Sequence, residues 1–287
     1  MRVYLNGRII DKTEAKISVE DRGFIFGDGV YEVWRVINGR LFETDRHHAR
    51  LEKGFRELQL TYPADLKRDA LQDVAERLLK ENDLLEGEAT FYLEVTRGAA
   101  PRAHHFPKDA KPTVYAFVNR ITPSNEQKSG GSAITMPDIR WHRCDIKTVQ
   151  LLPNVLAKQA AVEAGGVEAI LLRDGWVTEA SHSNVFVVLD GELRTHAATN
   201  LILPGITRAV VLDLAHDRGV PVRQQAVRGD DLAKADEVFI TGTTTDITPI
   251  IRIDGKAVAK GKPGPITVKL QAALRAHMEA FASAQPA

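Results

Sequence analysis

Asn-Gly and Asp-Gly pairs between short apolar runs are the feature that most restricts how this chain can fold. The pairs in question are Asn6-Gly7, Asn38-Gly39, Asp174-Gly175 and Asp190-Gly191. Asparagine, aspartate and glycine accept the left-handed backbone of a two-residue hairpin turn more readily than other residues do. The first pair lies between Val3–Leu5 and Arg8–Ile10, and the second follows the alternating run Val30–Ile37. The pattern predicts antiparallel strands in both halves of the chain.

Helical spacing follows the first strands. Leu51, Phe55 and Leu58 recur on one face of a helix that Asp45 can cap. The other elements expected here are a helix through Leu71–Leu79 and strands at Ala89–Thr96 and Thr113–Ile121. Together they predict an α+β unit with its helices grouped in the middle.

A polar segment, Thr122–Ser132, separates this unit from a second one. Its Pro, Asn, Gln and Lys residues and its Gly130-Gly131 pair are typical of an interdomain linker. After it we expect a helix that ends near Gly165-Gly166 and two more near Ile206–Asp217 and Ile266–Phe281. The chain is therefore predicted to be an α/β (α+β) protein of two domains. These are a small N-terminal domain at 1–121, a linker at 122–132 and a larger C-terminal domain at 133–287.

Charge and cysteine content exclude several classes of protein. The 287 residues include 38 Lys and Arg and 38 Asp and Glu, so the formal net charge is zero. A balanced charge gives no excess of positive charge that would indicate binding to nucleic acid or to an anionic membrane. The single Cys144 cannot form an intrachain disulfide, which favours a reducing compartment. With no signal-peptide pattern and no bilayer-length apolar run, we expect a cytoplasmic protein.

Lys147 is the first residue with a candidate chemical role. It follows a strand-like stretch, Asp138–Trp141, and has Trp141, Ile146 and Val149 around it in sequence. Desolvation by such neighbours lowers the pKa of a lysine and leaves more free amine to attack a carbonyl. The alternative is a surface lysine that pairs with Asp145.

Two segments could bind a phosphate, and one glutamate could bind a cationic ring. In Leu203-Pro204-Gly205-Ile206-Thr207-Arg208 a helix would begin with free N–H groups at Ile206 and Thr207. Thr241-Gly242-Thr243-Thr244-Thr245, after a strand at Glu237–Ile240, offers N–H and O–H donors. Glu179 lies near the end of a hairpin strand, where it could pair with a protonated cofactor nitrogen. The alternatives are an ordinary helix start, a threonine-rich turn and a surface or capping glutamate.

Taken in order, these segments resemble the fold type IV enzymes that depend on pyridoxal phosphate (PLP). The matching motifs are Asp21-Arg22-Gly23, Phe26-Gly27-Asp28-Gly29-Val30-Tyr31-Glu32, Arg50-Leu51, Lys147, Thr178-Glu179 and Pro204-Gly205-Ile206-Thr207-Arg208. Their order and spacing extend over nearly the whole chain. The family contains D-amino acid aminotransferases, branched-chain L-amino acid aminotransferases, R-selective amine aminotransferases and aminodeoxychorismate lyases.

The resemblance implies a role for each matching residue. Lys147 would hold PLP as a Schiff base and then move the proton between the substrate Cα and the cofactor C4′. Glu179 would pair with the pyridine nitrogen, and Leu203 would pack against the ring. The implied phosphate ligands are Arg50, Ile206, Thr207, Gly242 through its N–H, and Thr243. Tyr31 would line the substrate pocket.

One loop narrows the implied substrate. Arg97-Gly98-Ala99-Ala100-Pro101-Arg102-Ala103-His104 is similar to a loop of bacterial D-amino acid aminotransferases. In those enzymes the Arg and His come from the neighbouring subunit and, with the pocket tyrosine, bind the substrate α-carboxylate. Arg102 offers a planar fork of donors that suits a carboxylate, and His104 adds one more. The resemblance thus implies a homodimer that transaminates a D-amino acid, such as D-alanine, with 2-oxoglutarate as a suitable acceptor. The alternative from the residues alone is a solvated basic loop.

Two positions depart from the D-amino acid pattern, and other functions remain open. Gly242 stands where relatives often have serine, and His182 where they often have small hydroxyl residues. The pairs His47-His48 and His104-His105 lack metal-ligand spacing, so no metal site is predicted. The other functions considered are another fold type IV activity, such as the lyase, and a phosphate-binding module without catalysis.

Overall fold

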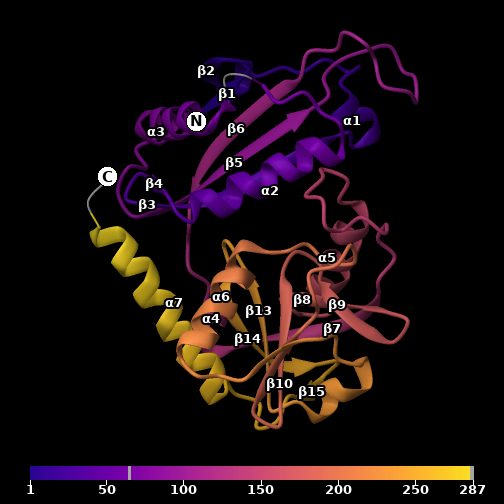
Figure 1. Ribbon diagram of the computed structural model, residues 1–287, viewed down its shortest axis with the longest axis vertical. Helices are drawn as coiled ribbons and strands as arrows, with labels where there is room; N and C mark the ends of the chain where they lie inside the picture. The colour runs from indigo at the N-terminus through magenta and orange to yellow at the C-terminus, as the bar shows by residue number, and fades with distance from the viewer. Residues whose placement is uncertain (64–65, 285–287) are drawn as a thin grey trace. The chain divides into compact units, whose positions relative to one another are not determined.

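The computed structural model describes residues 1–63 and 66–284, which form two compact units (Figure 1). Unit 1 contains residues 1–121 together with 146–150, and unit 2 contains residues 122–145 and 151–283. Lys147 therefore belongs to unit 1, although the residues on both sides of this short segment, 122–145 and 151–283, belong to unit 2. Residues 122–132, expected to be a linker, hold helix α4 and the first residues of strand β7.

Unit 1 is built on an antiparallel sheet whose described strands follow the order β2-β1-β6-β5-β3-β4. Its elements are β1 (Arg2–Leu5), β2 (Arg8–Asp11), a 3-10 helix (Lys12–Glu14), α1 (Arg22–Phe26), β3 (Gly29–Ile37), β4 (Arg40–Leu41), α2 (Thr44–Glu57), α3 (Arg68–Glu81), β5 (Glu88–Thr96) and β6 (Thr113–Arg120). The first predicted hairpin is confirmed: Asn6 and Gly7 take φ values of 48° and 88°, and Leu5 pairs with Arg8.

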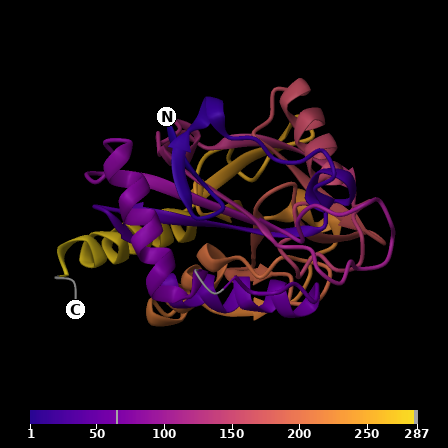
Figure 2. The ribbon, with the colours of Figure 1, turned by 90° about the horizontal axis from the view of Figure 1, so that it is seen from above.

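Helices α2 and α3 cover one face of this sheet (Figure 2). Leu51 and Phe55 of α2 and Leu78 of α3 are buried in one cluster with Trp34 and Phe91 of the strands. The helical spacing in the sequence therefore identified the buried faces.

The predicted cap of α2 is wrong. Glu43 occupies the N-cap position without a side-chain cap bond, and Asp45 lies in the first turn. A carboxylate in the first turn is still stabilised by the positive end of the helix dipole.

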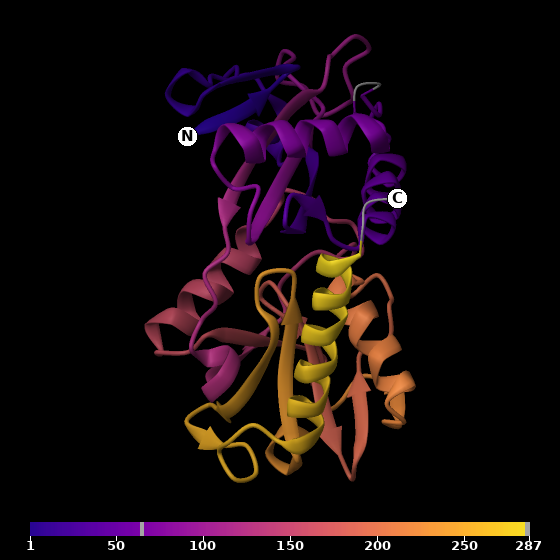
Figure 3. The same cartoon turned by 90° about the vertical axis from the view of Figure 1, so that its left-hand side faces the viewer.

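Unit 2 is built on a mixed sheet with the described order β12-β11-β10-β13-β14-β7-β8-β9, and β15 pairs with β14. Its elements are α4 (Glu126–Ser129), β7 (Gly131–Pro137), α5 (Leu152–Glu163), β8 (Glu168–Arg173), β9 (Trp176–Ala180), β10 (Asn184–Leu189), β11 (Glu192–Thr195), α6 (Ile206–Asp217), β12 (Val222–Gln224), a 3-10 helix (Gly229–Lys234), β13 (Glu237–Gly242), β14 (Asp246–Ile253), β15 (Lys256–Ala257) and α7 (Pro265–Ser283). The predicted hairpins β8–β9 and β10–β11 are confirmed. Figure 3 shows α6 and α7 against this sheet.

One end of the unit 2 sheet gathers several chain reversals. Strand β9 ends at Ala180, and β10 begins at Asn184 after a three-residue turn. Asn184 lies opposite Thr241, the residue before the last of β13. Antiparallel neighbours bring such ends together, so the turn after Glu179 and the threonine loop share one edge.

No helix in the described part of the chain is both long and apolar enough to cross a membrane.

Gly98, in the loop after β5, packs closely against the backbone of Lys111. Its φ is 91°, and a Cβ there would lie 1.8 Å from the carbonyl oxygen of Lys111. Gly7 has a nearly equal φ of 88° but open space around it. We expect Gly7→Ala to cost about 1–2 kcal/mol of unfolding free energy from backbone strain. Gly98→Ala should cost about 2 kcal/mol more, because the clash adds to the strain. Equal losses in urea unfolding would show that the Gly98 contact with Lys111 does not constrain the loop.

Candidate active site

Lys147 lies in the segment that returns to unit 1, and not directly after a strand. The strand expected at Asp138–Trp141 is absent, since β7 ends at Pro137. Asp138 accepts hydrogen bonds from the backbone N–H of Arg140 at 3.1 Å and from its Nε at 2.9 Å. Such local side-chain bonds compete with a ladder and hold this stretch in an irregular conformation.

Backbone bonds fix Lys147 beside Tyr31. The N–H of Tyr31 donates to the Lys147 carbonyl at 3.0 Å, and the N–H of Val149 donates to the Gly29 carbonyl at 3.1 Å. The half-buried Lys147 side chain places Nζ 4.1 Å from the centroid of the Tyr31 ring. Asp145, the alternative partner in the sequence, is ion-paired with Arg143 at 3.0 Å. The segment that holds Lys147 thus lies beside β3, and its amine is brought against the phenol ring of Tyr31.

Arg50 is oriented by a buried carboxylate on the same strand. Its Nε donates to Oε2 of Glu32 at 2.9 Å and its Nη2 to Oε1 at 2.6 Å. Nδ1 of His47 lies 3.0 Å from Oε1. Burial raises the pKa of Glu32, but Arg50 and His47 outweigh it and hold that pKa well below its usual range. The ionised glutamate fixes the direction of the Arg50 guanidinium.

The motif around Asp28 supports the start of β3. Asp28 Oδ2 accepts from Nε of Arg22 and from Nε of Arg97, both at 2.8 Å. Burial raises the pKa of Asp28, and the two arginines lower it below its usual value. A Cβ at Gly29 would lie 2.9 Å from the carbonyl oxygen of Val95, so this glycine permits the close pairing of β3 with β5.

Arg102 and His104 lie on the exposed loop after β5, beside Phe26. The Arg102 guanidinium carbon is 5.4 Å and the His104 ring 5.7 Å from the Phe26 ring centroid. Nη1 of Arg22 donates to the Ala103 carbonyl at 2.6 Å and anchors the loop between them. Within the described chain, neither side chain forms a hydrogen bond, ion pair or ring contact with Tyr31 or Lys147.

Glu179 is buried at the end of β9 and is held by donors from three segments. Its carboxylate accepts from Nη1 of Arg140, from Nδ2 of Asn184 at 2.9 Å, and from the N–H of Leu203 at 3.0 Å. Burial raises the pKa of Glu179 to about 7, against the opposing effect of Arg140. Asp138, which shares Arg140, also raises this pKa. The environment favours an added positive charge next to Glu179.

The two predicted phosphate segments lie near this carboxylate. Helix α6 begins at Ile206 with Gly205 as its N-cap and no side-chain cap bond, so Ile206 and Thr207 open the helix. A Cβ at Gly205 would lie 2.1 Å from the Asn184 Oδ1, so only glycine fits there. Asn184 also donates to the Leu203 carbonyl at 2.8 Å, which ties this turn to Glu179.

The threonine loop contains unused donors. The buried hydroxyls of Thr241 and Thr245 have no hydrogen-bond partner in the described structure. A Cβ at Gly242 would lie 2.7 Å from the Thr245 Oγ1 and 4.0 Å from the Ser183 Cβ. Thr243, the other predicted residue of this loop, follows Gly242 directly. Buried hydroxyls without partners beside an uncapped helix suit an anionic ligand such as a phosphate.

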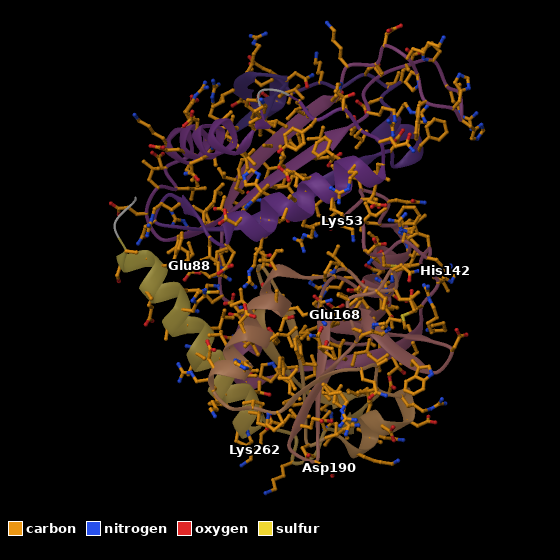
Figure 4. All side chains as sticks on the ribbon, viewed as in Figure 1. Lys53, Glu88, His142, Glu168, Asp190 and Lys262 are labelled. Atoms are coloured by element: carbon orange, nitrogen blue, oxygen red, sulfur yellow. The ribbon has the colours of Figure 1, made fainter. Side chains whose placement is uncertain are left out.

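Sequence reasoning missed the residues that support these groups. Arg140 had no motif of its own, and Glu32 was noticed only as part of a longer motif. Glu168, labelled in Figure 4, was not considered, although it is buried at the start of β8. A charged residue inside an apolar strand pattern is the one available signal for Glu32 and Glu168. Among residues 1–63 and 66–284, no group of three or more His, Cys, Asp or Glu side chains could hold a metal ion.

Comparison with known proteins identifies the family. Residues 29–253 match the family model described as amino-transferase class IV. Over 276 residues the chain is 46% identical to a D-alanine aminotransferase of Bacillus licheniformis, with 96% of each protein covered. Over 274 residues it is 47% identical to a D-alanine aminotransferase of Listeria innocua, covering 94% of this chain and 93% of that protein. The chain belongs to the class IV aminotransferases.

Solved structures agree on the fold. The branched-chain amino acid aminotransferase of Escherichia coli superposes with a TM-score of 0.87 at 26% identity, covering 96% of this chain and 93% of that one. The branched-chain aminotransferase of the archaeon Thermoproteus uzoniensis, solved with norvaline, gives 0.84 at 28% identity, with coverages of 96% and 93%. A further branched-chain enzyme, complexed with N-(5'-phosphopyridoxyl)-L-glutamate, gives 0.86 at 26% identity, with coverages of 99% and 95%. The predicted α/β fold of type IV is confirmed.

The raised pKa of Glu179 predicts a pH effect on the ligand-free protein. Between its ordinary pKa of 4.5 and about 7, the folded protein keeps a proton that the unfolded chain has lost. Stability should therefore fall as pH rises through this range, by about 3 kcal/mol at most. Glu179→Gln should remove that loss. The measurement is urea unfolding of both proteins at pH 5 and pH 8, and parallel pH profiles would contradict the prediction.

Proposed function

We propose that this chain catalyses ping-pong transamination between a D-amino acid, such as D-alanine, and a 2-oxo acid, such as 2-oxoglutarate. The observation that carries the proposal is the 46% identity to a D-alanine aminotransferase over 96% of both proteins. The contact of Lys147 with Tyr31 and the buried environment of Glu179 support the same chemistry.

The residues fit PLP as cofactor. Unit 2 offers Glu179 for the pyridine nitrogen, Leu203 for the ring, and Ile206, Thr207, Gly242 and Thr243 for the phosphate. Unit 1 offers Lys147 for the aldehyde and Arg50 for the phosphate. We propose that PLP is the cofactor of these residues, and that residues 133–287 act as the PLP-binding domain, joined through 122–132 to a small domain at 1–121. When bound, PLP supplies a carbonyl for the amino group and an electron sink.

Lys147 has two tasks in this proposal. Its Nζ holds the cofactor covalently between reactions and, once displaced by the substrate amine, carries the proton that leaves the substrate Cα. Tyr31, packed against Lys147, keeps the amine in place and presents a hydroxyl to the substrate. Glu179 keeps a proton on the ring nitrogen, and its buried position excludes water that would weaken this charge interaction.

Arg102 and His104 would bind the substrate α-carboxylate from the partner subunit of a homodimer. Both side chains are exposed, and their loop is anchored by Arg22 and the Asp28–Arg97 ion pair. An anchored and exposed pair of donors suits a site supplied to a second copy of the chain. The side from which the carboxylate is bound then selects the D configuration.

A second candidate is transamination of branched-chain L-amino acids. It is favoured by the TM-score of 0.87 with the Escherichia coli branched-chain enzyme. The sequence identity to that branched-chain enzyme is 26%, well below the 46% identity to the D-alanine aminotransferase of Bacillus licheniformis.

A half-reaction screen tests the function and separates the two candidates. The PLP-loaded protein is mixed with D-alanine, L-valine or L-leucine alone, and loss of the visible cofactor band is followed. We expect D-alanine to convert the cofactor at least about 100-fold faster than either L-amino acid. Faster reaction with the L-amino acids would establish the second candidate, and a protein that takes up no PLP would overturn both.

Lys147→Ala is the matched variant in this screen. It should reduce the half-reaction by about 1000-fold or more, because covalent capture and proton transfer are both lost. Borohydride should fix PLP on Lys147 of the wild type, as judged by peptide mass. Lys158→Ala, which removes a lysine of α5, is the control and should keep turnover.

Arg102→Leu tests the carboxylate trap. Loss of a charge-assisted bidentate contact should raise KM for D-alanine about 10-fold or more while the Kd of PLP stays unchanged. His105→Leu, in the same exposed loop, is the control and should change KM little. An unchanged KM in Arg102→Leu would remove this residue from substrate binding. Full activity of a verified monomer would contradict a trap supplied by a partner.

A further inference from the structure

The turn Ser181–Ser183 between β9 and β10 closes around one buried carboxylate. Glu168, the first residue of β8, is fully buried. Its Oε1 accepts from the hydroxyl of Ser181, and its Oε2 accepts from the hydroxyl of Ser183 at 2.8 Å. Nδ1 of His182 lies 2.6 Å from Oε2. All three turn residues are thus directed by the same group.

The charge of Glu168 must be balanced by this turn. Burial raises its pKa, but hydrogen bonds and charge from His182, with the bonds from Ser181 and Ser183, lower it to about 2. Of these three residues, only histidine can carry a positive charge. The contact of Nδ1 with the Glu168 carboxylate fixes the orientation of the His182 ring.

His182 is the one residue of this turn whose side chain keeps a polar atom facing away from Glu168. A serine hydroxyl has a single hydrogen, and those of Ser181 and Ser183 are given to Glu168. The His182 side chain is 45% exposed, and its Nδ1 is engaged. Nε2, on the other side of the imidazole, is left to face a ligand.

The turn lies next to the segments that suit a phosphate. Ser183 Cβ is 4.0 Å from the Cβ position of Gly242, in the loop with the unpartnered hydroxyls of Thr241 and Thr245. Asn184, the next residue, contacts both Glu179 and the turn before α6. The Ser181 carbonyl accepts from Nδ2 of Asn154 at 2.7 Å, which anchors the turn from α5.

We propose that His182, oriented by the buried carboxylate of Glu168, donates a charged hydrogen bond to the phosphate of the bound cofactor. The inference rests on the proposed PLP function and adds a cationic phosphate ligand from the β9–β10 turn. Glu168 acts through His182 as a positioning residue.

The test compares PLP with pyridoxal, which lacks the phosphate. Kd values of both are measured by tryptophan fluorescence on cofactor-free wild type, His182→Ala and His182→Lys. His182→Ala should bind PLP about 10-fold more weakly and leave the Kd of pyridoxal unchanged, because one charged hydrogen bond to the phosphate is lost. His182→Lys should recover part of the PLP affinity by restoring a cation. His216→Ala, an exposed histidine near the end of α6, is the control and should change neither Kd.

Glu168→Gln tests the positioning role. It should lower PLP affinity, and the double variant with His182→Ala should show little further loss, since both act through one contact. Should Glu168→Gln fail to fold, as judged by circular dichroism, the exposed His182 variants still decide the proposal. Equal PLP affinity in wild type and His182→Ala would overturn it, as would equal weakening of PLP and pyridoxal. A wild type that binds no PLP would instead defeat the proposed function.

Discussion

The hydrogen bonds that hold the carboxylate of Glu179 organise unit 2 around the candidate site. Arg140 reaches it from the irregular stretch after β7, Asn184 from the start of β10, and Leu203 from the turn before α6. A buried carboxylate without such donors would cost several kcal/mol, so each segment is constrained to bring its donor to the same point. The start of α6 and the β9–β10 turn are therefore fixed relative to Glu179.

In unit 1, too, buried carboxylates fix the positions of the groups that bind them, and here those groups are arginines. Glu32 fixes Arg50, and Asp28 joins Arg22 to Arg97. Removing one partner of such a buried pair leaves an uncompensated charge, which is far costlier than losing an exposed pair. The proposed phosphate ligand Arg50 and the loop that carries Arg102 thus depend on carboxylates that touch no substrate in the proposed mechanism.

Local signals in the sequence predicted much of the fold. The Asn6-Gly7 hairpin and the buried face of α2 follow from backbone preference and spacing, which depend on neighbouring residues alone. The strand expected at Asp138–Trp141 failed because the Asp138 side chain binds the backbone and guanidinium of Arg140. That competition depends on a charge network shared with Glu179, which no local pattern contains. The family motifs predicted a cofactor role for Lys147, but its contact with Tyr31 arises from pairing between distant segments.

Glu168 and Glu179 show how donors decide what a buried carboxylate can do. Both lie at the same end of the unit 2 sheet. The pKa of Glu168 is lowered to about 2, because its contacts with His182 and with the hydroxyls of Ser181 and Ser183 outweigh the effect of burial. The pKa of Glu179 is raised to about 7, because burial dominates and its arginine is shared with Asp138. Glu168 is thus satisfied within the protein, whereas Glu179 gains from a further cation. In the proposed function a protonated pyridine ring would supply that cation, and the unpartnered hydroxyls of Thr241 and Thr245 would remain available to its phosphate.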